Sequence, residues 1–222
     1  MDRSTATRFR RQLDLVDQER LADLPVTVIG AGAIGSFATL VLAKMGAHGL
    51  TVWDPDTVET HNLPNQMFGE RAIGQNKAEA TARLVEHFEG VEIDARAESF
   101  EDGEVGEVAV MAVDSIKARR AIWEDLRVRP GLDVVVDGRM GAEVCELYAV
   151  RPDRPDDVRL YGESLHAADE AQEAPCTAKS TIWCAGSAAS LMASMVVKFL
   201  MGRPFPRRTT FDLRQTHLMT QQ

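Results

Sequence analysis

The sequence has 222 residues, 45% of them hydrophobic, which is enough to bury a sizeable core in a single domain. A net charge of −9 and a pI near 5.1 argue against broad binding of nucleic acid or anionic membranes. Three cysteines without Cys-x-x-Cys spacing suggest neither a disulfide framework nor a zinc site. Because we find no signal core and no membrane span, we expect a soluble, cytoplasmic protein.

The N-terminal segment, residues 1–24, is predicted to form a helical arm. From Arg8 to Ala22, Leu and Val recur among charged residues at roughly helical intervals, without Pro or Gly. The arm is basic although the chain is acidic. Its apolar residues are few, so we expect it to dock weakly on its own core and to be well placed to cross a subunit interface.

The chain is organised around a glycine-rich stretch that begins at Val26. A β-branched apolar run stops on Gly30, Gly32 and Gly35, which have the spacing of the dinucleotide fingerprint. This pattern predicts a strand, a phosphate-binding loop and the start of a helix. Asp54 ends the next apolar run, at the interval of about 20 residues where such folds place a carboxylate on the ribose.

The remaining elements predict an α/β fold. After Asp54 comes a polar loop, residues 55–66, of the kind that usually carries function. Further predicted helices are 37–45, 76–89, 116–126 and 180–201, and further strands are 50–54, 91–95, 108–114, 132–137, 143–150 and 209–213. Residues 151–179 have no clear period and are predicted to form a long loop.

We therefore predict one Rossmann-like, doubly wound domain with a mostly parallel sheet. It comprises the helical arm (1–24), a nucleotide-binding core (25–140) and an antiparallel C-terminal extension (141–222) that contains the crossover loop 151–179.

Several polar residues are expected to meet at the carboxyl edge of this sheet. The glycine loop, Asp54 and Asp114 end neighbouring strands, and Lys77 begins the helix after the polar loop. Together they would cradle phosphate, hold ribose, neutralise phosphate charge and bind magnesium. Lys77 and Asp114 also have simpler interpretations. A lysine at a helix start is often solvated, and an aspartate after a strand is often a helix cap.

The order of these motifs resembles the ThiF/MoeB family of ubiquitin-activating-enzyme-like adenylyltransferases over nearly the whole chain. The matching segments are Arg8–Gln12, Gly30–Gly35, Asp54–Glu59, Asn62–Gln66, Ile73–Ala78 and Val113–Ser115.

The resemblance implies that ATP adenylates the C-terminal carboxylate of a small ubiquitin-like or sulfur-carrier protein or a peptide. Lys77 and Arg11 would stabilise phosphate charge, and Asp114 would hold Mg²⁺. Arg11 would reach into the partner's site of a homodimer. The expected ATP-binding residues are Gly30, Ala31, Gly32, Ala33, Ile34, Gly35, Asp54, Asp56, Asn62, Asn65, Gln66, Lys77, Val113, Asp114, Ser115 and Arg139.

Two departures from the family pattern matter. Asn65 stands where the family usually has a phosphate-clamping arginine. Arg139, just beyond a predicted strand, could supply that charge, or it could be an ordinary salt-bridged arginine. The paired cysteines that bind structural zinc in many family members are missing, so we expect no zinc.

Cys176 precedes the last long helix, where several family members carry a cysteine that receives the activated group. Its thiolate could attack an acyl-adenylate if Lys179 lowered its pKa, although a lone cysteine can equally be inert. Cys145 and Cys184 are interpreted as core residues.

Two other functions remain open. The glycine fingerprint and Asp54 would serve a nicotinamide-dependent oxidoreductase equally well, but neither Tyr148 nor Tyr161 has a lysine four residues on. The chain could also be a non-catalytic nucleotide-binding module, for which Asn65 is the best evidence.

Overall fold

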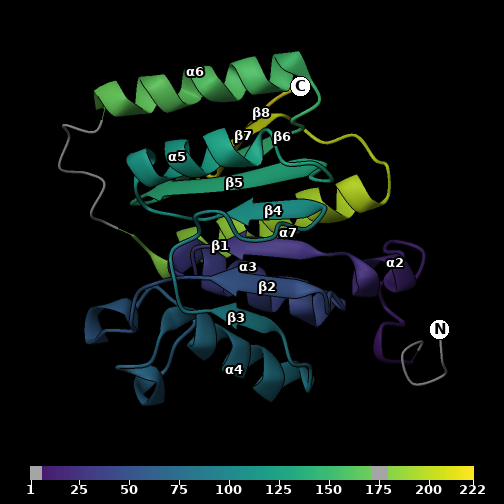
Figure 1. Ribbon diagram of the computed structural model, residues 1–222, viewed down its shortest axis with the longest axis vertical. Coiled ribbons are helices and arrows are strands. Elements are labelled where there is room, and N and C mark those ends of the chain that lie inside the picture. Colours follow the sequence, from purple (N-terminus) through teal and green to yellow (C-terminus); the bar gives the residue numbers. More distant parts are fainter. Residues whose placement is uncertain (1–6, 172–179) are drawn as a thin grey trace.

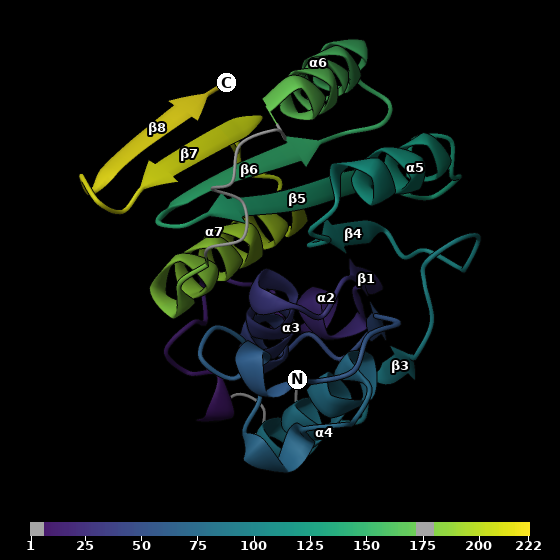
Figure 2. The ribbon, with the colours of Figure 1, turned by 90° about the vertical axis from the view of Figure 1, so that its left-hand side faces the viewer.

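The computed structural model describes residues 7–171 and 180–222, which form one sheet with helices on both faces (Figures 1 and 2). The eight described strands run in the order β3-β2-β1-β4-β5-β6-β7-β8. They are β1 (Val26–Ile29), β2 (Leu50–Trp53), β3 (Asp94–Arg96), β4 (Val108–Met111), β5 (Val134–Gly141), β6 (Val144–Val150), β7 (Arg208–Asp212) and β8 (His217–Gln221). The helices include α2 (Gln18–Asp23), α3 (Ala33–Met45), α4 (Lys77–Glu89), α5 (Ile116–Leu126), α6 (Pro155–Ala171) and α7 (Ile182–Leu200), with short 3-10 turns η1 (Thr60–Asn62) and η2 (Glu70–Ala72).

The strands β3, β2, β1, β4 and β5 are parallel and form the predicted nucleotide-binding core. All residues of β1 and β4 are buried, as expected for strands covered by helices on both faces. The chain winds outward from β1 in both directions, which leaves the ligand crevice of such folds beyond the carboxyl ends of β1 and β4. The predicted fold class is confirmed.

The predicted antiparallel extension is also present, but it is larger than the sequence indicated. β5, β6, β7 and β8 pair antiparallel in succession. The single strand predicted at 209–213 corresponds to β7, and β8 was missed. Every residue of β8 is exposed. Because neither face of this strand is buried, its sequence does not alternate between apolar and polar residues, which is the pattern that predicts a strand.

The prediction of a loop over 151–179 is wrong for much of its length, because α6 occupies 155–171. Pro155 begins this helix, and Asp156 and Asp157 lie in its first turn, where acidic residues are favourable. Tyr161 and Leu165 are 0% and 2% exposed and lie four residues apart on its buried side. The sequence pattern did not predict this helix, because its few apolar residues are surrounded by many charged ones.

The prediction for the N-terminal arm needs a correction as well. No helix extends from Arg8 to Ala22, because Asp14 has a left-handed φ of 69° and α2 starts only after its N-cap, Asp17. Phe9 and Val16 are each 8% exposed, so the described arm docks on its own chain. The expectation of a weakly docked arm was therefore wrong.

The helices divide into two layers. α4, α3 and α7 lie side by side on one face of the sheet, and α5 and α6 cover the other. Among the described helices, α7 is long and apolar enough to cross a membrane by length and composition. Half of that stretch is buried, which fits a helix that packs on β5 and β6 and beside α3.

Candidate functional site

The glycine loop joins β1 to α3, and its three glycines meet different surroundings. Gly30 has a φ of 94°, a backbone conformation that glycine adopts without strain. A Cβ on Gly35 would lie 1.8 Å from the Gly30 carbonyl oxygen, so only glycine lets the helix approach the strand this closely. A Cβ on Gly32, the residue before α3, would meet no described atom within 4 Å. The backbone at Gly32 is thus open to a ligand at a helix N-terminus, where phosphate binds.

Asp54 holds this loop from the end of β2. Its carboxylate accepts hydrogen bonds from the backbone N–H groups of Ala31 (2.6 Å) and Asp56 (2.9 Å), and it is 5% exposed. Burial raises the pKa of Asp54 above its ordinary value, although these two N–H groups and the charge of Lys77 act in the opposite direction. The carboxylate therefore ties the glycine loop to the start of the polar segment.

Lys77 lies beside this segment, as predicted. Its Nζ donates to Asp56 Oδ2 at 2.9 Å, and its backbone N–H donates to the Asp56 carbonyl at the same distance. The Lys77 side chain is 11% exposed and that of Asp56 is 64% exposed. Because Asp56 is mostly in water, the pair can open and leave the lysine available to a phosphate.

Asn76 was not predicted, yet it fixes the position of Lys77. It is the N-cap of α4, and its Oδ1 accepts from the backbone N–H of Glu79. Its Nδ2 donates to the carbonyls of Asp54 and Asp56 at 2.8 and 3.0 Å. Asn76 is the first residue of the helix predicted at 76–89, and an asparagine at a helix start is a capping signal, which could have identified it.

The segment around Asn65 contains side-chain oxygens that lack partners. Asn65 Nδ2 donates to Ser180 Oγ, but the buried Oδ1 of Asn65 has no partner among the described residues. The same is true of Oε1 of Gln66, which is 8% exposed. Asn62 is different, because its Oδ1 accepts from the N–H of Glu59 and completes a capping box. Buried polar oxygens without partners are the kind of group that a polar ligand can satisfy.

Asp114 follows β4 at the same edge of the sheet and is exposed. It has no hydrogen-bond or ion-pair partner among the described residues. The next residue, Ser115, caps α5 by accepting from the N–H of Ala118 at 3.3 Å, so the cap interpretation applies to Ser115 and not to Asp114. Asp114 is therefore free to bind a cation.

Arg139 lies within a buried polar cluster on the α5 and α6 face. Its Nε donates to Asp137 at 2.8 Å, its Nη2 donates to Ser164 Oγ at 3.0 Å, and its side chain is 12% exposed. Burial disfavours the charged form, but Asp137 and Tyr161 outweigh that effect and raise the pKa of Arg139. This is the salt-bridged interpretation, and a contact of Arg139 with ATP stays a prediction.

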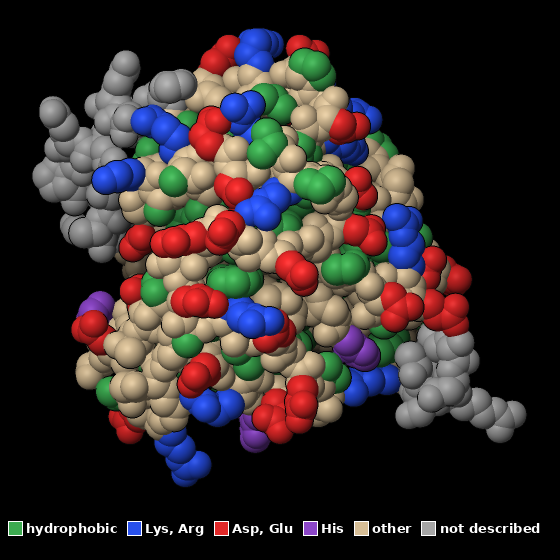
Figure 3. Space-filling model, viewed as in Figure 1, with side chains coloured by type: hydrophobic (Ala, Val, Ile, Leu, Met, Phe, Trp, Pro, Cys, Tyr) green, Lys and Arg blue, Asp and Glu red, His purple; other side chains and the backbone are tan. Residues whose placement is uncertain are grey.

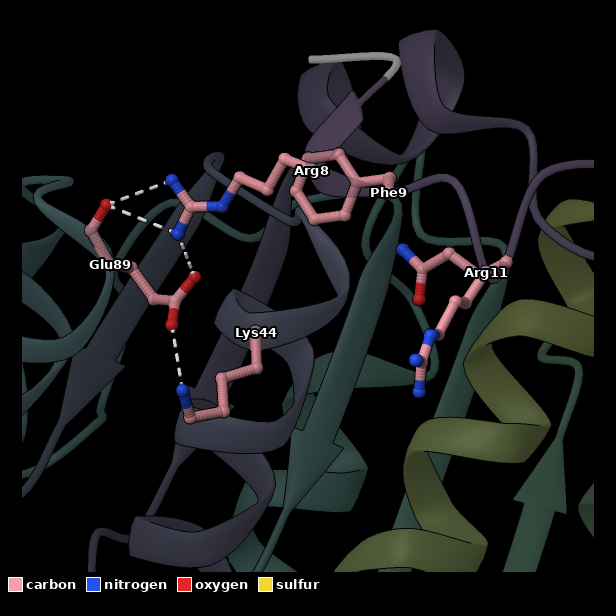
Figure 4. A pocket seen from close by; sticks show the side chains of 6 residues that line it. Arg8, Phe9, Arg11, Lys44 and Glu89 are labelled. Atoms are coloured by element: carbon pink, nitrogen blue, oxygen red, sulfur yellow. Dashed lines mark hydrogen bonds and ion pairs between the residues drawn. The ribbon is translucent and has the colours of Figure 1, made fainter. Parts of the chain in front are cut away.

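Arg11 lies away from the other predicted residues. It lines a cleft with Arg8, Phe9, Lys44 and Glu89 (Figure 4). Arg8 and Lys44 both pair with Glu89, whereas Arg11 points away from it and has no described partner. The cleft lies at the C-terminal ends of α3 and α4, and the glycine loop and Lys77 lie at their N-terminal ends.

Two of the three cysteines, Cys145 and Cys184, lie among the described residues. Cys145 and Cys184 are 0% exposed, which confirms their interpretation as core residues. A hydrogen bond between the two thiols lowers the pKa of Cys145 and raises that of Cys184. Cys176 lies outside the described residues, so its role stays a prediction.

The residues present fit ATP and a magnesium ion. The open backbone at Gly32 would accept phosphate, and the unpartnered oxygens of Asn65 and Gln66 would accept hydrogen bonds from a ligand. No group of three or more His, Cys, Asp or Glu that could hold a metal is found among the described residues. Mg²⁺ does not need one, because it is commonly bound by one or two carboxylates together with substrate phosphates.

Curated relatives resemble part of this chain. Over 99 residues it is 37% identical to the molybdopterin-synthase adenylyltransferase of Salmonella typhimurium, a match that covers 40% of each protein. Over 104 residues it is 36% identical to the NEDD8-activating enzyme E1 catalytic subunit of Arabidopsis thaliana, covering 44% of this chain and 23% of that protein. The matches thus span less than half the length of these relatives.

Solved structures share the fold over a longer stretch. PaaA superposes with a TM-score of 0.79 at 18% identity, covering 100% of this chain and 84% of PaaA. E. coli MccB, solved with ATP, gives a TM-score of 0.73 at 18% identity, covering 92% and 65%. The family model of the ThiF family matches residues 4–222. Since that match takes in the glycine loop, Lys77 and Asp114, which the structure places at one edge of the sheet, the chain belongs to the ThiF family.

Proposed function

We propose that this protein is an ATP-dependent adenylyltransferase that activates the C-terminal carboxylate of a small ubiquitin-like or sulfur-carrier protein or of a peptide. One observation carries the proposal: open backbone at Gly32, a nearly buried Lys77 and an unpartnered Asp114 lie at the same edge of the sheet. A dinucleotide site has no need for this combination of a phosphate clamp and a free metal ligand.

In the proposed reaction, a carboxylate oxygen of the substrate attacks the α-phosphorus of ATP, and the bond to the bridging oxygen breaks to release pyrophosphate. The glycine loop binds phosphate through its N–H groups, and Asp54 accepts from the ribose. Lys77 leaves Asp56 and stabilises the charge that develops on phosphate. Mg²⁺ held by Asp114 would neutralise the leaving group. This scheme requires no zinc.

The proposed assembly is a cytoplasmic homodimer in which Arg11 serves the partner's site. The remoteness of Arg11 from its own glycine loop supports this, because within one protomer α3 separates them. Transfer of the activated group to Cys176 is a further step of the same proposal.

A non-catalytic nucleotide-binding module is the second candidate. Asn65 favours it, because a neutral side chain that donates to Ser180 stands where the family usually has an arginine. Such a module would bind ATP without turnover.

ATP–pyrophosphate exchange, measured with and without a candidate carboxyl partner, tests the proposal. We expect exchange that requires ATP, Mg²⁺ and the partner, and thermal stabilisation by ATP with Mg²⁺ in preference to NAD. Stabilisation by ATP without exchange for any partner would favour the non-catalytic module. If NAD protects the protein and ATP with Mg²⁺ does not, the nucleotide assignment is wrong.

A further inference from the structure

A buried carboxylate, Asp137, lies at the carboxyl end of the parallel sheet and binds two arginines. It is 0% exposed and accepts from Arg119 Nε at 2.8 Å, from Arg139 Nε at 2.8 Å and from Tyr161 O–H at 3.0 Å. Arg119 is itself only 2% exposed. Burying two cations with one anion is costly unless each group is fully hydrogen-bonded, so the cluster calls for an explanation beyond stability.

Arg119 extends from this cluster to the loop that carries Asp114. Its Nη2 donates to the carbonyl of Val113 and, at 3.2 Å, to the carbonyl of Gly138. One guanidinium therefore joins the end of β4 to β5. Val113 directly precedes Asp114, and Ser115 directly follows it as the cap of α5. The backbone on both sides of Asp114 is thus fixed by hydrogen bonds, whereas the Asp114 side chain is exposed and has no described partner.

We propose that Arg119 is a positioning residue: anchored by Asp137, it fixes the Val113 backbone and thereby directs the Asp114 carboxylate toward a divalent cation. The inference rests on the proposed metal role of Asp114. A carboxylate on a loosely held loop would lose conformational freedom when it binds metal, and a loop that is already fixed avoids that cost. Mutation of a residue that orients a metal ligand without binding the metal itself typically lowers metal affinity by about 10- to 100-fold.

Arg119→Lys tests this role, because lysine keeps the positive charge but cannot bind Asp137 and two carbonyls as a guanidinium does. Two measurements are needed. Hydrogen–deuterium exchange reports the backbone amides of Ala118 and Arg119, which donate to the Ser115 hydroxyl and carbonyl beside Asp114. Calorimetry reports ATP affinity with and without Mg²⁺. We expect exchange at these amides to quicken about tenfold. We expect the Mg²⁺-dependent gain in ATP affinity to fall at least tenfold, while metal-free ATP binding changes less than about twofold.

Asp157→Asn is the matched control, because Asp157 is also buried, at 3% exposure, and pairs with Arg207 at 2.8 Å. Asp157 also accepts a hydrogen bond from the backbone N–H of Arg151, the residue after β6. The end of β6 pairs with the start of β5, at Val135. The Asp157–Arg207 pair therefore lies at the edge of the sheet opposite to Asp114. The control should lose stability. It should not change amide exchange at Ala118 and Arg119 or the gain in ATP affinity from Mg²⁺. If Arg119→Lys does not fold, Tyr161→Phe removes one hydrogen bond from Asp137 and should shift both measurements in the same direction by about two- to threefold.

The outcomes separate this role from the proposed function. If the wild type gains no ATP affinity from Mg²⁺, the metal role of Asp114 fails and the inference fails with it. If the wild type does gain affinity but Arg119→Lys, or Tyr161→Phe in its place, keeps the full gain and normal amide exchange, only the positioning role is overturned. Equal losses in Asp157→Asn would also overturn it, because Arg119 would then act through global stability.

Discussion

At the scale of single residues, two glycines of the loop, Gly35 and Gly32, are required for different reasons. Gly35 lies against the Gly30 carbonyl, whereas Gly32 faces open space. Substitution at Gly35 therefore disturbs folding, and substitution at Gly32 disturbs only what approaches the loop from outside. This difference makes Gly32 the more informative position for testing ligand binding.

We predict that Gly32→Ala lowers ATP affinity at least tenfold, because a methyl group would occupy the space that a phosphate needs. The same substitution should change the free energy of unfolding by less than about 1 kcal/mol, because the added methyl group meets no described atom. Calorimetry and urea unfolding would measure these effects. Gly69→Ala is the control, since a Cβ there also meets nothing described within 4 Å, and Gly69 lies outside the loop. Unchanged ATP affinity in Gly32→Ala would show that phosphate does not bind at this glycine.

Lys77→Ala and Asp114→Ala should each reduce the rate of adenylation by about a hundredfold or more, corresponding to roughly 3 kcal/mol for one lost charge contact at the transition state. Pyrophosphate exchange on well-folded variants would measure this. Lys198→Ala and Asp94→Ala, which remove the same charges on α7 and β3, should keep exchange near the wild-type rate. A fully active Lys77 or Asp114 variant would remove that residue from the mechanism.

At the scale of elements, sequence patterns predicted the parts of the molecule whose signals are local. The helix predicted at 116–126 matches the bounds of α5, because its apolar residues recur with a helical period. The glycine loop, Asp54 and Lys77 were placed correctly at one edge of the sheet because strand ends converge there. The contacts of Asn76, Arg119 and Tyr161 were not predicted. Asn76 binds the carbonyl of Asp54, and Arg119 and Tyr161 bind the buried carboxylate of Asp137, all of them distant in the chain. Spacing along one element cannot show such contacts.

The missed helix α6 is the most consequential difference, because Tyr161 and Ser164 on it complete the cluster around Asp137 and Arg139. If α6 is firmly docked, Leu165→Ala should cost about 2–5 kcal/mol in the free energy of unfolding, as expected for truncating a side chain that is 2% exposed. Urea unfolding would measure it. Glu163→Ala on the same helix removes only an exposed ion pair with Arg159 and should cost less than about 0.5 kcal/mol. Equal, small losses in both variants would indicate a loosely attached segment.

At the scale of the whole molecule, the predicted site is divided between two ends. Figure 1 shows α2 and the described arm on the right and the loop between β2 and α4 on the left. The cleft lined by Arg11 and the glycine loop lie at opposite ends of α3, whose 13 residues span about 20 Å. On the face shown in Figure 3, acidic and basic side chains are interspersed, so no single-sign field there would draw a highly charged partner.

If the proposed dimer forms, we expect the second copy to cover the face formed by α3 and α7. α3 and α7 lie side by side, and α7 is only half buried although it is strongly apolar, with Ile182 and Trp183 43% and 54% exposed at its start. A two-fold axis perpendicular to these helices would pack them antiparallel against their copies. Each glycine loop, at the start of α3, would then lie near the partner's Arg11, at the end of α3.

This arrangement predicts complementation between two inactive variants. Arg11→Ala and Lys77→Ala chains should each be inactive alone, but a mixed dimer contains one site with Lys77 from one subunit and Arg11 from the other. Random mixing makes about half of the dimers mixed, each with one of two sites intact, so on the order of a quarter of wild-type exchange activity should return. Mixing Lys77→Ala with Asp114→Ala is the control, because those residues belong to the same chain's site and no intact site can form. If subunit exchange is verified and activity does not return with Arg11→Ala, Arg11 acts within its own chain or has no role.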